Sequence, residues 1–406
     1  MIPISQAPIY PQEILKTTSE YFKTSANSRN NSTAYAKFRD EISNYLNCKY
    51  VNLTCSGFSG LYTIMRAYDL KKGDEVIVPA YTCKDVLRLV TTMGLKLKLV
   101  DIEPYTYNMD PDSLNKEISS KTRVVIATHM FGYPCSIDKI TEISHDHGAM
   151  VIEDACQSMG AEYKEKKVGT YGDAGLFSLN MGKPITTIHG GIVCTDDSEL
   201  SNKVSAINDT FKKYGFMHQI KTFTYMFGYS LCNVNAFYSL VYSLMGNKNL
   251  GETNSISYSE LGDLMYKYTE FQASLGVKQL SKLDAYNNAR IKNASYLMEN
   301  LDKDGLFFPE VSEQMKPAYS RFPIYFENIS RENCNKLINS FINSGIEVTP
   351  YLPESLPHLY NEKSSDFPIA EQMTNKTLTV PTHPNMDKKD LDKIVEILNH
   401  RFHVLH

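Results

Sequence analysis

The sequence lacks several features that would assign it to a familiar class. It has no tryptophan, which by itself excludes no function, and no Cys-x-x-Cys pair, internal repeat or low-complexity tract. Its eight cysteines are irregularly spaced, which predicts reduced thiols rather than a disulfide framework, and no metal site is expected. The amino-terminal stretch MIPISQAPIYPQEIL has no signal-peptide pattern, so we expect a cytoplasmic protein. A formal net charge of −4 gives no indication of nucleic-acid binding.

What the sequence does contain is an alternation of helices and short apolar strands. Asp110 and Pro111 are typical of the first two positions of a helix start. Continuous apolar strands that alternate with helices predict a mostly parallel sheet with helices on both faces, and ligands gather at the carboxyl ends of such strands. A helix is expected at 34–47, and strands are expected at 50–54, 73–82, 97–101 and 123–129.

The chain is organised around residues 151–191. This stretch opens with an apolar run that ends in Glu153-Asp154, and it continues to Lys183 in a small, glycine-containing segment. A carboxylate at a strand end and a lysine on a turn are what pyridoxal phosphate (PLP) chemistry requires. The lysine binds the cofactor covalently, and the carboxylate keeps the pyridine nitrogen protonated.

The same stretch resembles the DegT/DnrJ/EryC1/StrS family of PLP-dependent sugar aminotransferases. The family pattern is E-D-x-A-Q/H, G-T-x-G-D, F-S-F, K and G-G, in that order. This chain matches it at Glu153–Gln157, Gly169–Asp173, Phe177–Leu179, Lys183 and Gly190-Gly191. The resemblance extends from about residue 35 to the end of the chain.

The resemblance implies the type I PLP-transferase fold and a homodimer with shared active sites. We expect an N-terminal arm at 1–33, a large PLP-binding α/β domain at 34–285 and a small C-terminal α+β domain at 286–406. A long helix at about 269–301 should join the two domains. Residues 205–262 are atypical of the family.

The resemblance also assigns roles at the site. Lys183 is implied as the catalytic lysine, Asp154 as the partner of the ring nitrogen and Gln157 as a contact of the ring's phenolic oxygen. Ser178 is implied as a phosphate ligand. Where the family has an acidic residue before the Gly-Gly pair, this chain has His189, which becomes a candidate for substrate binding.

A strand, a small-residue turn and a helix follow one another at Cys55-Ser56-Gly57-Phe58-Ser59. Such a turn presents free backbone N–H groups that bind phosphate, although the same pattern is an ordinary helix cap in many proteins. In the resembled family the segment is S-G-T and holds the PLP phosphate. Here Ser56 and Gly57 match, Phe58 replaces the threonine, and Ser59 is expected to supply the missing hydroxyl.

Three further residues follow strand ends. Cys83 stands where the family often has an aromatic residue stacked on the cofactor, so either Cys83 packs on the ring or Tyr81 or another side chain stacks there. The alternative for Cys83 is a small buried thiol. His129 matches the family's V-H-x-x-G, and it either lines the pocket or is a structural histidine.

A second departure concerns a phosphate contact that the family receives from the neighbouring subunit. The asparagine that makes it is Met265 here, and the arginine of the same motif is Lys267. Lys267, or an asparagine such as Asn233, is the expected replacement.

Residues 222–247 contain no charged side chain, and the second half has helical apolar spacing. The stretch is long enough to cross a bilayer, but polar residues interrupt it. Three interpretations stay open, namely helices packed in the core or dimer interface, a lid over the substrate, and contact with a membrane or a lipid substrate.

The sequence therefore predicts a PLP-dependent aminotransferase that moves an amino group from glutamate or glutamine to a keto-sugar, by resemblance nucleotide-linked. Lys183 favours amino transfer, because sugar dehydratases of the family carry histidine there. The alternatives are an aminotransferase for a non-nucleotide or lipid-linked ketone, and a scaffold protein without turnover.

Overall fold

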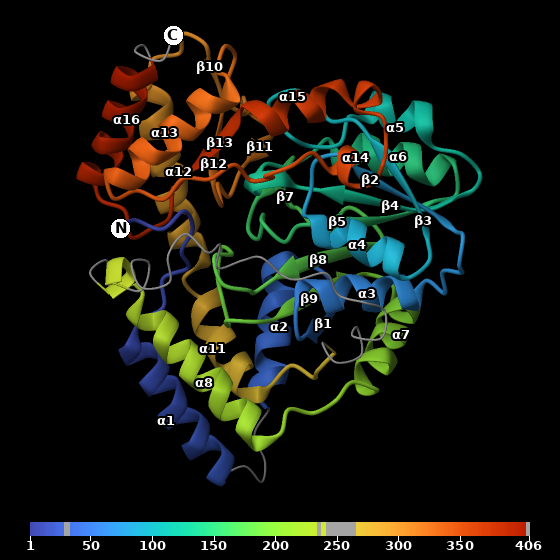
Figure 1. Ribbon diagram of the computed structural model, residues 1–406. Helices are drawn as coiled ribbons and strands as arrows, with labels where there is room; N and C mark the ends of the chain where they lie inside the picture. Colours follow the sequence, from blue (N-terminus) through green and yellow to red (C-terminus); the bar gives the residue numbers. More distant parts are fainter. Residues whose placement is uncertain (28–32, 234–236, 241–264, 403–406) are drawn as a thin grey trace.

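A seven-stranded sheet forms the centre of the protein (Figure 1). The computed structural model describes residues 1–27, 33–233, 237–240 and 265–402. Across the sheet the strands are β1 (Tyr50–Thr54), β9 (Gly191–Thr195), β8 (Ala174–Ser178), β5 (Met150–Asp154), β4 (Thr122–Thr128), β2 (Glu75–Pro79) and β3 (Lys96–Val100).

The sheet is mostly parallel, as predicted. The pairs β2–β3, β2–β4, β4–β5 and β5–β8 are parallel, and only β9 runs against its neighbours β1 and β8. The other six strands therefore end at the same edge. This arrangement brings the segments after Thr54, Pro79, Thr128, Asp154 and Ser178 to one side of the sheet.

Helices cover both faces of the sheet. Successive strand residues point to opposite faces, and both faces carry apolar side chains that the helices bury. Val151 packs in one core and Ile152 in the other. On the face of Ile152 lie α3 (Gly57–Ala67), α4 (Lys84–Thr92) and α7 (Ser198–Asp209). On the face of Val151 lie α2 (Ala34–Leu46), α5 (Pro111–Glu117), α6 (Ile137–Asp146) and α11 (Glu270–Leu280). Asp110 caps α5 and Pro111 opens it, as predicted.

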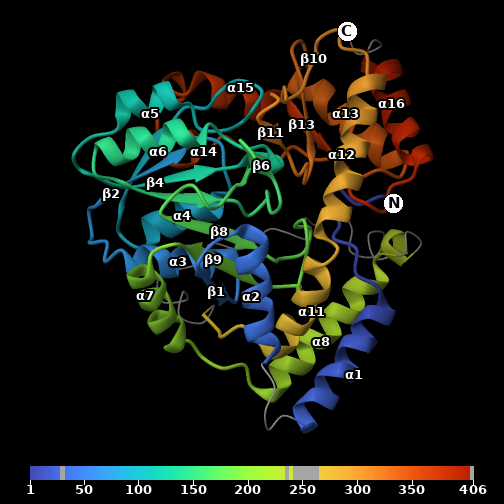
Figure 2. The ribbon, with the colours of Figure 1, turned by 180° about the vertical axis from the view of Figure 1, so that it is seen from behind.

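A smaller lobe follows in the C-terminal part of the chain (Figure 2). Its antiparallel sheet has the order β10 (Leu306–Phe307), β12 (Phe322–Phe326), β13 (Thr377–Val380). Its helices are α13 (Arg331–Asn343), α14 (Leu356–Leu359), η3 (Ser364–Asp366), α15 (Pro368–Lys376) and α16 (Lys388–Phe402). Between the lobes lie η1 (Met130–Gly132) and a sheet of β11 (Met315–Lys316), β6 (Glu162–Tyr163) and β7 (Lys166–Lys167). The domain boundary at 285/286 stays a prediction.

The expected long helix at 269–301 is two helices. Helix α11 ends at Leu280 and α12 spans Leu283–Asn300, with a turn at Ser281-Lys282 between them. Lys282 lies in this turn with a φ of −106°, and its ammonium pairs with Glu13 at 2.7 Å.

The N-terminal arm contains a helix, α1 (Pro11–Asn27), which the sequence analysis did not predict. It lies beside α8 (Phe216–Leu231), the helix that holds the first part of the uncharged stretch (Figure 1). Ile9, Ile14 and Met226 form a separate small core there. For residues 222–231 the structure therefore supports packing of one face of α8, around Met226, against α1. The helix predicted from Phe237 to Met245 lies mostly outside the described residues.

Candidate active site

Gly191 brings the end of β1 against the end of β8. It is paired with Thr54 on one side and with Ser178 on the other. A Cβ atom on Gly191 would lie 2.3 Å from the carbonyl oxygen of Ser56 and 2.5 Å from Thr54 Oγ1. Only glycine fits there, so the Gly-Gly pair lets the Ser56 turn approach Ser178.

The turn at Ser56 begins helix α3 in the predicted way. Ser56 is the N-cap, and its hydroxyl accepts a hydrogen bond from Ser59 N at 3.0 Å, while Ser59 Oγ accepts from Ser56 N at 3.0 Å. A Cβ atom on Gly57 would lie 3.1 Å from Cys156 Sγ and 3.2 Å from Ser178 Cβ. Gly57 thus leaves a narrow space between the helix N-terminus and Ser178, which suits a small anion.

Two residues of this turn differ in position from the sequence-based expectation. Ser59 is fully buried, and its hydroxyl forms hydrogen bonds with the backbone of Ser56. It is therefore not positioned to supply the hydroxyl of the family threonine. The ring of Phe58 is half-buried against helix α4, and the Arg88 guanidinium lies 5.6 Å from its centre. Neither the Ser59 hydroxyl nor the Phe58 ring therefore takes the place of the family threonine.

Asp154 ends β5 as a buried carboxylate with no ion pair in the described part of the chain. Its Oδ1 accepts from Cys156 N at 3.1 Å, and the Cys156 thiol also hydrogen-bonds to it. A buried carboxylate without a cation is costly unless a ligand supplies one. The protonated ring nitrogen of PLP would meet that need, so this residue fits the cofactor.

Lys183 approaches the same place from the turn between β8 and β9. Burial raises the pKa values of the Cys83 and Cys156 thiols, and the nearby charge of Lys183 opposes that rise at both of them. The negative charge of Asp154 contributes to the raised pKa of both thiols. Lys183, Asp154 and the two thiols therefore lie close enough to influence one another, and Cys83, partly buried, is the N-cap residue of α4.

The small lobe contributes a wall that the sequence analysis missed. Gln157 Nε2 donates to the Tyr351 hydroxyl at 3.0 Å. The Arg321 guanidinium lies 5.7 Å from the centre of the Tyr351 ring, and Tyr81 stacks on the other side of the cluster, 6.0 Å from Tyr351. Tyr81 is itself buried among aromatic rings. Nothing local to residues 321 and 351 marks them, because the fold alone brings them to Gln157.

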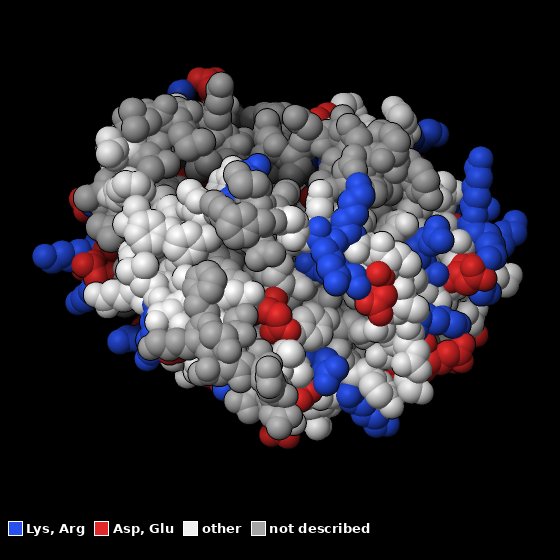
Figure 3. Space-filling model, turned by 90° about the horizontal axis from the view of Figure 1, so that it is seen from below, with Lys and Arg blue, Asp and Glu red and all other residues white. Residues whose placement is uncertain are grey.

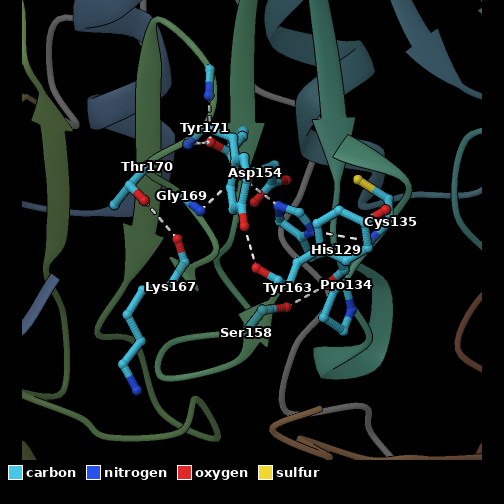
Figure 4. Close-up of polar contacts among 12 residues, drawn as sticks. His129, Pro134, Cys135, Asp154, Ser158, Tyr163, Lys167, Gly169, Thr170 and Tyr171 are labelled. Atoms are coloured by element: carbon cyan, nitrogen blue, oxygen red, sulfur yellow. Dashed lines mark hydrogen bonds and ion pairs between the residues drawn. The ribbon is translucent and has the colours of Figure 1, made fainter. Parts of the chain in front are cut away.

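His129 does not line the site. It is fully buried, its Nε2 lies 3.0 Å from Glu153 Oε2, and its Nδ1 accepts from Cys135 N at 3.1 Å (Figure 4). Both ring nitrogens are used, so His129 is the structural histidine of the two alternatives. Because Nδ1 accepts a bond, the ring proton lies on Nε2.

The carboxylate of Glu153 is the centre of this buried network. It accepts backbone hydrogen bonds from Gly169 at 2.7 Å, from Gly172 at 2.6 Å and from Tyr171, besides the contact with His129. Most of these residues appear in Figure 4 beside Asp154. Glu153 therefore holds the G-T-x-G-D turn behind the strand whose last residue is Asp154.

Glu153→Gln is expected to destabilise the protein by about 3 kcal/mol, because an amide offers one acceptor oxygen and turns its own N–H groups toward buried donors. Denaturant unfolding measures the change. Asp154→Asn serves as the control, since it alters the adjacent carboxylate without opposing several backbone donors. Equal stability of the two variants would contradict the role assigned to Glu153.

The segments of Met265, Lys267 and His189 adjoin the Ser56 turn, because Tyr266 N donates to Cys55 Sγ at 3.5 Å and Gly191, two residues after His189, lies against Ser56. Lys267 pairs with Asp209 at 2.7 Å, and Met265 is buried. The side chain of His189 is exposed, and its carbonyl accepts from Gln272 Nε2 at 2.8 Å. Asn233 is buried and donates to the carbonyl of Ile9 at 2.8 Å, so it is not free to replace the missing asparagine.

Known proteins of several kinds are similar to this chain. A dTDP-3-amino-3,6-dideoxy-alpha-D-galactopyranose transaminase from Aneurinibacillus thermoaerophilus is 26% identical over 89% of this chain and 88% of its own. An uncharacterized protein of Methanocaldococcus jannaschii is 30% identical, over 88% of this chain and 87% of its own. The structure of a putative sugar aminotransferase from Streptococcus pneumoniae, in its PMP form, matches over 100% of both chains with a TM-score of 0.80 at 20% identity.

The fold and the arrangement at the carboxyl edge of the sheet define a type I PLP-dependent transferase. The model of the DegT/DnrJ/EryC1/StrS aminotransferase family matches residues 12–399. The chain belongs to this family of PLP-dependent aminotransferases, and it is an enzyme rather than a scaffold. Within the described residues, no helix is both long and apolar enough to cross a membrane.

Proposed function

We propose that the enzyme transfers an amino group from glutamate or glutamine to a nucleotide-linked keto-sugar, in amino-sugar or polysaccharide biosynthesis in the cytoplasm. The observation that carries the proposal is the convergence of Asp154, the Lys183 turn and the Ser56 turn on one edge of the sheet. The relative from Aneurinibacillus, which is named as a transaminase for a dTDP-linked amino sugar, supports the substrate class.

In this proposal the residues divide the work. PLP supplies an electron-accepting ring when it is bound. Asp154 keeps the proton on the ring nitrogen, and the amides at Ser56 and Gly57, with Ser178, hold the phosphate. Gln157 contacts the phenolic oxygen of the ring. Lys183 Nζ binds the cofactor, and as a free amine it takes the proton from the donor carbon and returns it on the acceptor side.

A substrate panel tests the proposal. Purified enzyme with PLP, glutamate and one keto-sugar at a time should release 2-oxoglutarate with a nucleotide-linked sugar. The same sugar without its nucleotide is the matched control. Turnover with the free sugar or with a lipid-linked ketone, and none with any nucleotide-linked sugar, would contradict the proposed substrate.

Arg321 is the residue best placed to bind a carboxylate of the amino donor. It is half-buried at the start of β12, and no ion pair is recorded for it among the described residues. Burial lowers its pKa, while Tyr351, Glu347 and Tyr81 oppose the change, so the guanidinium keeps its charge beside the wall formed by Tyr351 and Gln157. An arginine forms paired hydrogen bonds with a carboxylate.

Arg321→Met is therefore expected to raise the KM for glutamate by roughly tenfold to a hundredfold, the loss of one charge-assisted contact. The KM for the sugar should stay within about twofold. Steady-state kinetics with each substrate varied in turn measures both values. Arg123→Met, at the opposite edge of the sheet, is the control. An increase only in the KM for the sugar would assign Arg321 to the other substrate.

We further propose that the enzyme is a homodimer. Leu15 of α1 and Tyr225 of α8 are exposed to 54% and 53%, on two helices that contact each other. Seen from below, most of the described charged side chains lie in the right-hand half of the view, and smaller groups lie at its left edge (Figure 3). A second copy of the chain would bury these apolar groups, and sedimentation of the PLP-bound enzyme measures the oligomeric state.

A further inference from the structure

The backbone on both sides of Lys183 is held by side chains from distant helices. Before the lysine, the Gly182 amide hydrogen-bonds to the Tyr229 hydroxyl of α8. After it, the Pro184 carbonyl accepts from Arg290 Nη2 of α12 at 2.9 Å. The two residues adjacent to Lys183 are thus held by side chains that belong neither to its turn nor to the central sheet.

Tyr229 also joins the turn to the amino-terminal arm. Its hydroxyl accepts from Ala7 N at 3.3 Å as well as from Gly182. A Cβ atom on Gly182 would lie 2.6 Å from Ser5 Oγ, and its φ of +77° favours glycine. The arm is tied down in turn, since Gln6 Nε2 donates to the Cys232 carbonyl at 3.0 Å. The arm and the end of α8 form a backing layer behind the Lys183 turn.

Arg290 provides the second support. It is 2% exposed, and it donates to Asn287 Oδ1 at 3.0 Å as well as to the Pro184 carbonyl. Burial lowers its pKa to about 10, which still leaves it charged at neutral pH. No carboxylate is paired with it in the described part of the chain, so carbonyl and amide oxygens compensate the charge. Because the guanidinium group is planar and its donors are fixed relative to one another, the position of the Pro184 carbonyl depends on the orientation of Arg290.

We infer that Tyr229 and Arg290 are positioning residues that aim the Lys183 side chain at the carbonyl carbon of the cofactor. The inference rests on the covalent role proposed for Lys183. It gives a function to the beginning of the uncharged stretch, which serves as a support for the catalytic turn rather than as a lid or a membrane contact.

The test follows attachment of the cofactor to Lys183 and not turnover alone. Cofactor-free protein is mixed with PLP, quenched with borohydride at set times, and the labelled Lys183 peptide is measured by mass spectrometry. Tyr229→Phe removes one hydroxyl from a nearly unchanged shape, and attachment is expected to slow about tenfold, the effect of one lost hydrogen bond. Tyr296→Phe, which loses a hydroxyl contact with Asp392 elsewhere, should attach at the wild-type rate.

Arg290→Lys and Arg290→Gln extend the test. Lysine can still donate to the Pro184 carbonyl, so Arg290→Lys should attach PLP faster than Arg290→Gln. If Arg290 had only a structural role, both variants would have a lower melting temperature, and their attachment rates would not differ in this way. Wild-type rates in both Tyr229→Phe and Arg290→Gln would overturn the positioning role alone. A wild-type protein that attaches PLP at a lysine other than Lys183 would overturn the proposed site together with this inference.

Discussion

Lys183→Ala is expected to lower the rate of amino transfer by more than roughly 10⁴-fold, because the same amine supplies both the covalent attachment and the proton transfer. The variant should still fold, since the Lys183 side chain is half-buried at the open edge of the sheet and its removal leaves no buried group unpaired. PLP should bind to it only non-covalently.

Borohydride reduction followed by peptide mass spectrometry measures the attachment, and release of 2-oxoglutarate measures turnover. Lys72→Ala is the matched control, because Lys72 is an exposed lysine just before β2, at the amino edge of the same sheet. Retention of a reducible cofactor at another lysine with near-normal turnover in Lys183→Ala would show that the catalytic lysine lies elsewhere.

Asp154→Asn is expected to lower amino transfer by roughly 10²–10³-fold, the loss that follows when one partner of a buried charge pair is removed. The amide keeps the shape and can still accept the hydrogen bond from Cys156 N. It cannot hold a proton on the ring nitrogen, so the ring accepts electrons poorly. Attachment at Lys183 should persist, which separates this variant from Lys183→Ala.

Measuring the stability of Asp154→Asn without the cofactor gives a second, independent test of the role of Asp154. Asp154 has no cation partner among the described residues, so its neutralisation should leave the cofactor-free protein at least as stable as the wild type. With PLP bound, the order should reverse. Asp146→Asn, an exposed carboxylate before the opposite end of β5, should change neither quantity. A large loss of stability without PLP would indicate that Asp154 is a structural residue.

Local pattern was enough to predict the mostly parallel sheet, the strand at Tyr50–Thr54 and the cap of α5, because these depend on periodicity and on residues adjacent in the chain. It was also enough to predict the family and its cofactor, since the family's motifs from Glu153 to Gly191 lie in one continuous stretch of the chain. The helix α1 was missed because its apolar residues are few, and the broken helix at Ser281 because one turn residue leaves little trace in periodicity.

The tertiary structure alone decided which residues meet around that stretch. Arg321 and Tyr351 reach Gln157 from the small lobe, and Tyr229 and Arg290 reach the Lys183 turn from two separate helices. The structure likewise decided that His129 is buried on Glu153. The sequence pattern indicates which face of a helix or strand is apolar. Whether two residues far apart in the chain form a hydrogen bond depends instead on how whole helices and strands pack. The chain's motifs thus led to the roles proposed for Asp154 and Lys183, whereas the contacts around them came only from the tertiary structure.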